Sequence, residues 1–307
     1  MNNSIQYVSN DAINRIKWDH TINNAPNGFI YSRYFFLNAL CNWDALIMGD
    51  YEYVMPLPYK IKWGIAYLYT PYFVGQLGII SVRSVSETIV HDFILAIPKK
   101  FRYVDIVLNE YNPVGNLALA IIEKRNNYIL PLQNTYHEIE KHFLKDAKKN
   151  LRQAARNHLI TEEGIAVQTV IDLFKSAYGG LNQAIDEQLY ASFAIACKEA
   201  IAAGLGFTMA LKDNRGAVVC AAFFGKDEKR IYYICGAPNS AGRQMNATHV
   251  MIDAVIKKYS GSHYTLDFEG SDIPSVANFY KKFSPLQKKY PHIKMNRLPL
   301  WLKWIKK

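Results

Sequence analysis

The stretch that decides the fold is residues 207–236, FTMALKDNRGAVVCAAFFGKDEKRIYYICG. It contains three runs rich in apolar residues, at 207–212, 217–225 and 230–236, which are typical of β-strands. Between them lie residues 213–216 and 226–229, whose polar and glycine residues are typical of turns. The stretch therefore predicts a meander of three strands.

The segments on either side of this meander favour helices that alternate with further strands. We expect helices at 136–158, which holds no proline or glycine, and at 182–203, which Gly204 closes. After the meander we expect a helix at 245–259, a strand at 264–268, a helix at 273–283 and a β-rich segment to Arg297. This order predicts a mixed α/β unit.

The first half of the chain has the composition of strands with few helices. We expect strands at 43–48, 52–59, 64–69 and 101–108, with a hairpin turn at Gly49-Asp50, and a helix at 84–97 capped by Ser84 or Ser86. Asn126-Asn127 is expected to turn a second hairpin, between 119–123 and 128–132. We expect a boundary near Gln133–Thr135, which gives domains of residues 1–134 and 135–307.

The overall composition narrows the class of protein. Half of the 307 residues are hydrophobic and 13% are aromatic, so the chain can bury substantial cores. No run of about 18 apolar residues exists, which argues against a transmembrane helix. The start, Met1–Gln6, has neither the basic nor the apolar region of a signal peptide. The four cysteines form no C-x-x-C pair, which favours reduced thiols in a soluble, cytoplasmic protein.

Positive charge gathers on one predicted helix. The formal net charge is +10, which favours anionic partners such as nucleic acid, phosphorylated cofactors or an acidic membrane surface. At helical spacing, one stripe of the 136–158 segment holds Lys145, Lys148, Lys149, Arg152 and Arg156. Like charges on one stripe disfavour the helix, which is explained if they meet phosphates. The alternative is a solvated face that Glu138, Glu140 and Asp146 partly compensate, and both interpretations stay open.

A strand end beside a helix N-terminus suggests a second site. The strand at 230–236 leads to the helix at 245–259, whose free backbone amides could receive a pyrophosphate. Tyr280 on the following helix could reach the same cleft and protonate a leaving group. A tyrosine at such a position is more often a half-buried core residue.

Two carboxylates close the strand at 264–268. Asp267 and Glu269 would point to the same side of that strand, where they could bind an amine or act as a general base. In the alternative, Ser271 or Asp272 caps the next helix and Glu269 pairs with a lysine.

Several familiar sites are excluded. His137 and His142 lie five residues apart, so they cannot share a helix face as the histidines of a zinc protease do. The sequence has no P-loop, no G-x-S-x-G and no G-x-G-x-x-G motif. No cysteine and histidine residues have the spacing of metal ligands, so we expect no metal.

Four groups of residues together resemble the Fem-type aminoacyltransferases and related GNAT-fold acyltransferases. They are Trp43–Leu46 with 54–58 and 71–78, the basic segment Lys149–Asn157, the strand end Tyr232–Ala237, and Leu266–Ser271 with 277–283. The likeness covers most of the chain. It implies two tandem GNAT-like units, with an acyl donor and an amine acceptor meeting in a cleft of the second.

The resemblance also implies a mechanism. The amine attacks a thioester or ester directly, without a covalent enzyme intermediate, and strand-edge amides stabilise the oxyanion. Tyr280 matches the tyrosine that protonates the leaving thiolate in many GNAT enzymes, and Asp267 or Glu269 would orient or deprotonate the amine. No permanently bound cofactor is implied, and the donor would be acyl-CoA or aminoacyl-tRNA.

The donor loop departs from the GNAT pattern. The loop that holds the CoA pyrophosphate in GNAT enzymes corresponds here to Arg243, Gln244, Asn246, Ala247 and Thr248. Asn246 stands where that loop has glycine, and a side chain there obstructs close approach of the backbone to phosphate. Fem-type enzymes also lack this loop and use aminoacyl-tRNA.

The sequence therefore predicts an N-acyltransferase that binds a phosphate-bearing donor through the basic helix and residues 243–248. The alternative is a non-catalytic GNAT scaffold that has lost donor binding, which Asn246 favours. The end of the chain, 298–307, mixes tryptophans and lysines as interfacial membrane helices do, although docking of the tryptophans onto the sheet is the simpler interpretation.

Overall fold

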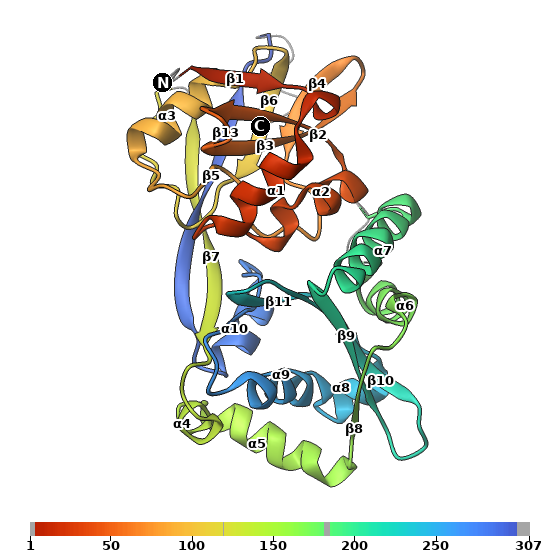
Figure 1. The fold of residues 1–307 in the computed structure, drawn as a ribbon. Helices are drawn as coiled ribbons and strands as arrows, with labels where there is room; N and C mark the ends of the chain where they lie inside the picture. Colours follow the sequence, from red (N-terminus) through yellow and green to blue (C-terminus); the bar gives the residue numbers. More distant parts are fainter. Residues whose placement is uncertain (1–3, 119, 181–184, 300–307) are drawn as a thin grey trace. The chain divides into compact units, whose positions relative to one another are not determined.

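The computed structural model describes residues 4–118, 120–180 and 185–299 (Figure 1). The chain forms two compact units, one of Met1–Arg125 with the segment from Lys289 onward, the other of Asn126–Lys288. The division falls inside β7 (Ile121–Pro131) and again inside β13 (Leu286–Asn296). The compact units thus begin and end at other residues than the expected domains, because the end of β13 pairs with a strand of the first unit.

The first unit is a sheet with the strand order β1-β2-β3-β4-β6-β13. Neighbouring strands are antiparallel except β4 and β6, which run parallel, and β5 pairs with β3. Helix α3 packs its apolar face into a core formed with these strands. The elements are β1 (Ile5–Val8), α1 (Arg15–Asn24), α2 (Tyr34–Leu40), β2 (Asn42–Met48), β3 (Tyr53–Lys62), β4 (Ile65–Tyr69), β5 (Ile80–Ser81), α3 (Glu87–Ala96) and β6 (Phe101–Val107).

The strands and the helix expected in this half are present. The predicted turn at Gly49-Asp50 connects β2 to β3, and Ser86 caps α3 because its side chain accepts the Ile89 N–H. The predicted hairpin at Asn126-Asn127 is wrong, since β7 runs straight through both residues. Asn127 is buried there, and its side-chain amide donates to Asp267 while its oxygen accepts the Tyr128 N–H. These tertiary and local bonds replace those that an asparagine forms in a turn.

The second unit is a mixed sheet with the strand order β7-β12-β11-β10-β9-β8, antiparallel except for β11 and β12. In Figure 1, α6 and α7 lie on the opposite side of β9 and β10 from α9. The core on the α9 side also takes in residues of α4, α5 and α10. The elements are α4 (Tyr136–Lys141), α5 (Lys145–Ala154), β8 (Ile160–Glu163), α6 (Val167–Tyr178), α7 (Glu187–Ala202), β9 (Gly206–Lys212), β10 (Val218–Lys226), β11 (Arg230–Pro238), α8 (Ser240–Gln244), α9 (Ala247–Tyr259), β12 (Thr265–Asp267) and α10 (Pro274–Lys281).

The predicted meander is present as β9, β10 and β11, and Gly204 ends α7 with a positive φ as expected. The expected helix at 136–158 is instead two helices, broken between Lys141 and Lys145. The residues that follow α10 hold the break, because the Phe143 ring packs edge-on against Phe283 and the Leu144 N–H donates to the Lys282 carbonyl. The expected helix at 182–203 begins at Glu187 within the described residues. The segment between the expected strand at 230–236 and the expected helix at 245–259 contains the short helix α8.

No helix in the described ranges is long and apolar enough to cross a membrane. Residues 300–307 of the 298–307 tail lie outside the described residues, so both interpretations of the tail, docking of its tryptophans onto the sheet and contact with a membrane surface, stay predictions.

Candidate functional site

The centre of the candidate site is the place where β11 and β12 separate. The two strands pair only over Arg230–Tyr232 and Thr265–Asp267. Beyond Tyr232, β11 continues beside β10 as far as Pro238. Its other edge there has no strand partner in the part of the chain that the structure describes. The backbone amides along that edge are therefore placed to bind an acyl oxygen or other ligand group.

Asp267, one of the predicted acids, is fully engaged by the protein. Its Oδ2 lies 2.7 Å from the Arg230 guanidinium and accepts a 3.2 Å bond from the Asn127 amide, while Oδ1 accepts the Glu269 N–H at 2.9 Å. Both members of the ion pair are buried. A buried carboxylate with these partners holds the end of β12 in place, and an amine would have to displace Arg230 to reach it.

Glu269, the second predicted acid, has a different environment. The prediction that it shares a strand face with Asp267 is wrong, because β12 ends at Asp267 and Glu269 has a left-handed backbone with φ of 63°. Gly270 follows with φ of 62°, and a Cβ there would lie 2.3 Å from the Asn126 carbonyl oxygen. The tight turn therefore requires glycine at 270 and turns Glu269 away from the strand.

The Glu269 carboxyl group has a buried oxygen, Oε1, without a hydrogen-bond partner among the described residues. Burial raises the pKa of Glu269 well above its usual range, and the nearby Asp267 charge raises it further, against a smaller lowering by Arg230. The alternative in which Glu269 pairs with a lysine finds no such ion pair in the described part of the chain. A buried carboxyl group with a raised pKa is suited to exchanging a proton with a bound ligand.

Tyr280 lies close enough to Glu269 for the carboxylate charge to affect it. Burial raises the pKa of the Tyr280 phenol, and the charges of Glu269, Tyr178 and Asp267 add to that effect. Its ring packs against Phe268, with the centroids 4.9 Å apart. The predicted acid Tyr280, on α10, thus lies within electrostatic range of the predicted base Glu269, in the turn after β12.

Sequence reasoning missed two further tyrosines of this cluster. Tyr233 is buried on β11, and its hydroxyl lies beside Gly236, where a Cβ would come within 2.5 Å of it. Burial raises the pKa of Tyr233, with smaller effects from Cys220, Tyr280 and Tyr178. Tyr178 ends α6, and the Arg243 guanidinium carbon lies 5.8 Å from its ring centroid. The Tyr232-Tyr233 pair was a visible signal, but nothing local marked Tyr178.

Of the residues that follow Glu269, Ser271 and Asp272 were expected to cap α10. Ser271 Oγ accepts the Ile273 N–H at 3.0 Å, just before the helix. Asp272 instead accepts from the Asn126 side-chain amide at 2.9 Å, and α10 has no side-chain cap at Ile273. Asp272 therefore ties this turn to β7.

The predicted donor loop lies at the junction of α8 and α9. Arg243 and Gln244 are exposed at the end of α8, and Asn246 takes the left-handed conformation with φ of 55° before α9 begins. Ala247 is buried, and the Thr248 side chain is hydrogen-bonded to Cys220, whose pKa burial raises to about 12. Arg243, Gln244 and Asn246 therefore lie outward, whereas Ala247 and Thr248 face the sheet.

In this junction the backbone comes close to the sheet at Gly242, which is not the position that Asn246 occupies. A Cβ at Gly242 would lie 2.0 Å from the Val219 carbonyl oxygen of β10. Gly242 thus seats α8 on the sheet, whereas the glycine position of the CoA loop is filled by Asn246.

Four of the five cations of the basic stripe lie on α5, and Arg156 lies in the short 3-10 helix Ala155–Asn157 that follows it. Lys145, Lys149, Arg152 and Arg156 are exposed, and no carboxylate pairs with them among the described residues. Glu138, expected to compensate them, closes a capping box with Thr135 instead. The alternative of a charge-compensated face is therefore not supported by ion pairs, and the stripe presents net positive charge to solvent.

A hollow of about 580 Å³ lies between α4, α5 and α9. Its apolar wall includes Leu151 and Val250, and Lys148 and Arg152 line it without a carboxylate partner in the described chain. Asp253 lies in the same hollow, where it accepts from the Tyr136 hydroxyl and from Lys257, both at 2.7 Å. Glu140 lines the hollow as well, so a ligand there would meet the cations Lys148 and Arg152 beside the carboxylates of Glu140 and Asp253.

His249 fixes α5 against α9 beside this hollow. Its Nε2 lies 3.0 Å from the Asn150 side-chain amide, and its ring lies edge-on to Phe279. Burial lowers the pKa of His249 to about 4, and the nearby Lys282 charge lowers it as well. The neutral ring therefore accepts the Asn150 bond at physiological pH.

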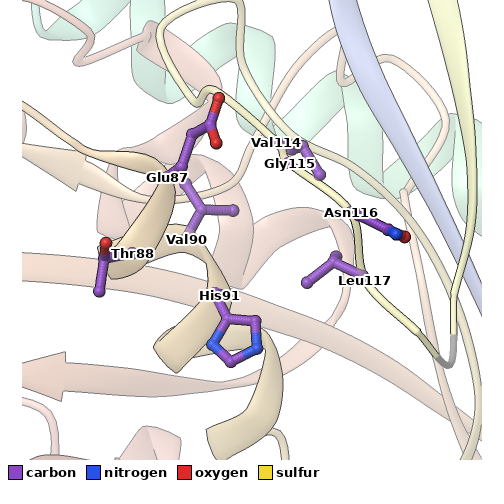
Figure 2. A pocket seen from close by; sticks show the side chains of 8 residues that line it. All are labelled: Glu87, Thr88, Val90, His91, Val114, Gly115, Asn116 and Leu117. Carbon is purple, nitrogen blue, oxygen red and sulfur yellow. The ribbon is translucent and has the colours of Figure 1, made fainter.

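The first unit has a smaller hollow, of about 250 Å³, beside α3. Figure 2 shows Glu87 and His91 on α3 facing the segment that contains Asn116 and Leu117. It contains none of the predicted site residues. Within the described ranges, no cluster of histidine, cysteine and acidic residues could hold a metal ion.

Comparison with known proteins identifies the fold. No protein-family model matches the sequence, and no curated protein matches it. Among solved structures, FemX superposes with a TM-score of 0.69 at 13% identity, covering 98% of this chain and 100% of FemX. L-PGS from Bacillus licheniformis superposes with a TM-score of 0.52 at 13% identity, covering 94% of each chain. A tandem GNAT protein from the clavulanic acid biosynthesis pathway superposes with a TM-score of 0.51 at 11% identity, covering 96% of this chain and 99% of that protein.

The chain therefore has the mixed α/β fold of FemX and the tandem GNAT proteins, as the sequence predicted. At these identities the likeness concerns the fold alone.

Proposed function

We propose that this protein is an N-acyltransferase whose chemistry takes place where β11 and β12 separate. The observation that carries the proposal is the buried Glu269 carboxyl group, with its unpartnered Oε1, close to the Tyr280 phenol in the described chain. Two groups with raised pKa values, within electrostatic range of each other, suit a reaction that removes one proton and supplies another.

The proposed reaction transfers an acyl group from the donor to the nitrogen of an amine acceptor. The acceptor nitrogen attacks the acyl carbon, so a C–N bond forms and the C–O or C–S bond to the donor breaks. Ionised Glu269 takes the proton that the amine loses, and the Tyr280 hydroxyl gives a proton to the leaving oxygen or sulfur. Backbone amides of β11 beyond Tyr232 stabilise the negative charge on the acyl oxygen.

We propose aminoacyl-tRNA as the donor in preference to acyl-CoA. The exposed cations of α5 have no carboxylate partner in the described chain, as a surface that binds a polyanion requires. The α8–α9 junction has Asn246 in place of the glycine of the CoA loop, and Thr248 faces Cys220. The Fem-type enzymes that the sequence resembles use the same class of donor.

A discharge assay tests this function. The protein is incubated with tRNA that carries a labelled amino acid and with a panel of primary amines, and release of label from the tRNA is followed. We expect release that depends on both protein and amine, and that falls on Glu269→Gln and Tyr280→Phe. Binding of charged tRNA without discharge by any amine would favour the non-catalytic scaffold. Discharge of acyl-CoA but not of charged tRNA would show that acyl-CoA is the donor.

A further inference from the structure

The tip of the β3–β4 hairpin, in the first unit, exposes large apolar side chains to solvent. Lys62 pairs with Ile65, so Trp63 and Gly64 alone form the turn. Trp63 is 77% exposed and Ile61 is 66% exposed. The Trp63 ring contacts its neighbour Lys62, whose ammonium nitrogen lies 4.8 Å from the ring centroid. These side chains therefore contribute little to packing of the unit.

Trp63 is also an unfavourable residue for this turn. Both turn residues have positive φ, 52° at Trp63 and 73° at Gly64, as in the two-residue turns that favour Asn-Gly. A bulky side chain rarely adopts this conformation, since its Cβ crowds the backbone. A strained and exposed tryptophan does not stabilise the hairpin. Its presence therefore points to contact with a binding partner.

The same end of the sheet is strongly basic. Strand β4 runs parallel to β6 with Ala66 opposite Phe101, so the segment before β6 lies at the hairpin end. Residues 59–69 and 97–104 contain no acidic residue, and their basic residues are Lys60, Lys62, Lys99, Lys100 and Arg102. Lys100 is held by Tyr7 and Asp44, whereas the other four have no carboxylate partner in the described ranges.

We propose that this hairpin docks the protein on an anionic lipid bilayer. Trp63 and Ile61 enter the boundary between headgroups and acyl chains, where tryptophan is favoured. Lys60, Lys62, Lys99 and Arg102 contact the lipid phosphates. A bilayer fits better than a nucleic acid because Ile61, two residues before Trp63, offers an aliphatic surface that neither stacks on bases nor bonds to them.

Vesicle co-sedimentation of the full chain tests this proposal. Vesicles of phosphatidylcholine alone are compared with vesicles that also contain phosphatidylglycerol, at low and moderate salt. We expect binding to the anionic vesicles that weakens with salt. Trp63→Asn suits the turn better than tryptophan, so the variant folds, yet its partition coefficient should fall about tenfold or more. Lys60→Gln with Lys62→Gln should lower it about twentyfold on anionic vesicles only.

The matched control is Ile16→Ser, which removes an apolar side chain that is 82% exposed on α1, outside the hairpin. It should leave binding unchanged. Unchanged binding of Trp63→Asn would overturn the proposal and direct attention to another surface. Absence of wild-type binding to anionic vesicles would overturn it as well. Equal loss in Ile16→Ser and Trp63→Asn would show non-specific adsorption, which also contradicts it.

Discussion

Arg230 and Asp267 form a buried ion pair, with Nη1 and Oδ2 2.7 Å apart, at the place where β11 and β12 separate. Arg230 is the first paired residue of β11 and Asp267 the last paired residue of β12, so the ion pair spans the whole parallel pairing. The candidate site depends on this pair because Glu269 and its left-handed turn follow directly from Asp267.

Arg230→Met should destabilise the protein by about 3–5 kcal/mol, because it leaves the Asp267 charge buried without its partner. Urea unfolding followed by circular dichroism measures this loss. The double variant Arg230→Met with Asp267→Leu should recover part of it, since both charges are then absent. A loss below about 1 kcal/mol in the single variant would show that Asp267 is not ionised or not desolvated.

Glu269→Gln and Tyr280→Phe should each lower turnover in the discharge assay by about 10²- to 10⁴-fold while both variants stay folded. The residual rate of Glu269→Gln should lose the rise with pH that the wild type shows, since only ionised Glu269 takes a proton. Tyr72→Phe, at an exposed tyrosine outside the cluster, is the control and should keep the wild-type rate. Similar small losses in all three variants would remove general acid–base catalysis from the mechanism.

Glu269 should also make stability depend on pH. Its pKa in the folded state is raised above the ordinary value of 4.5, so above pH 4.5 the unfolded chain loses this proton first. The stabilising effect of the proton is thus fully present below that pH and is lost as pH rises. Glu269→Gln should therefore gain in melting temperature relative to wild type between pH 4.5 and 8. A constant difference across that range would contradict the raised pKa.

His249 should have the opposite pH dependence. Its pKa is lowered from 6.5 to about 4, so between these values the unfolded chain binds a proton that the folded protein does not. Stability should fall by about 1–2 kcal/mol as pH drops from 7 to 4, allowing for screening by water. Urea unfolding of His249→Gln should lack this component. His137→Gln, on an exposed residue, should retain it.

The cations of α5 and the adjacent Arg156 should control binding of charged tRNA. Lys149→Gln, Arg152→Gln and Arg156→Gln together should weaken binding and reduce the dependence of affinity on salt, by about one unit of slope for each phosphate that is no longer neutralised. Filter binding at several salt concentrations measures both. Lys198→Gln, an exposed residue of α7, is the control for net charge. An unchanged slope in the triple variant would place the donor elsewhere.

Gly242→Ala should displace α8, because its Cβ would lie 2.0 Å from the Val219 carbonyl oxygen. We expect a loss of about 1–3 kcal/mol in stability and weaker donor binding. Gly180→Ala is the matched control, since no atom lies within 4 Å of a Cβ there. Equal stability of the two variants would show that α8 can shift at little cost.

The sequence by itself determined the elements whose pattern is local. The meander at 207–236 alternates apolar strands with turn residues, and Gly204 and Ser86 mark helix ends by their own conformation and hydrogen bonding. The stripe from Lys145 to Arg152 follows from helical periodicity alone and is present on α5, whereas Arg156 lies beyond the end of the helix. The motifs around Tyr280 and Glu269 were visible for the same reason, as short runs of neighbouring residues.

Tertiary structure decided what depends on residues distant in the chain. Asn127 lies in a strand, where its side-chain amide donates a hydrogen bond to Asp267. The helix expected at 136–158 breaks where Phe143 packs against Phe283. Arg230 engages Asp267, and Tyr178 joins the site from α6. The return of β13 to the first unit sets the limits of both units. Such interactions gain their free energy from burial of partners that no local pattern specifies, so they outweigh local preferences that amount to only a few tenths of a kcal/mol per residue.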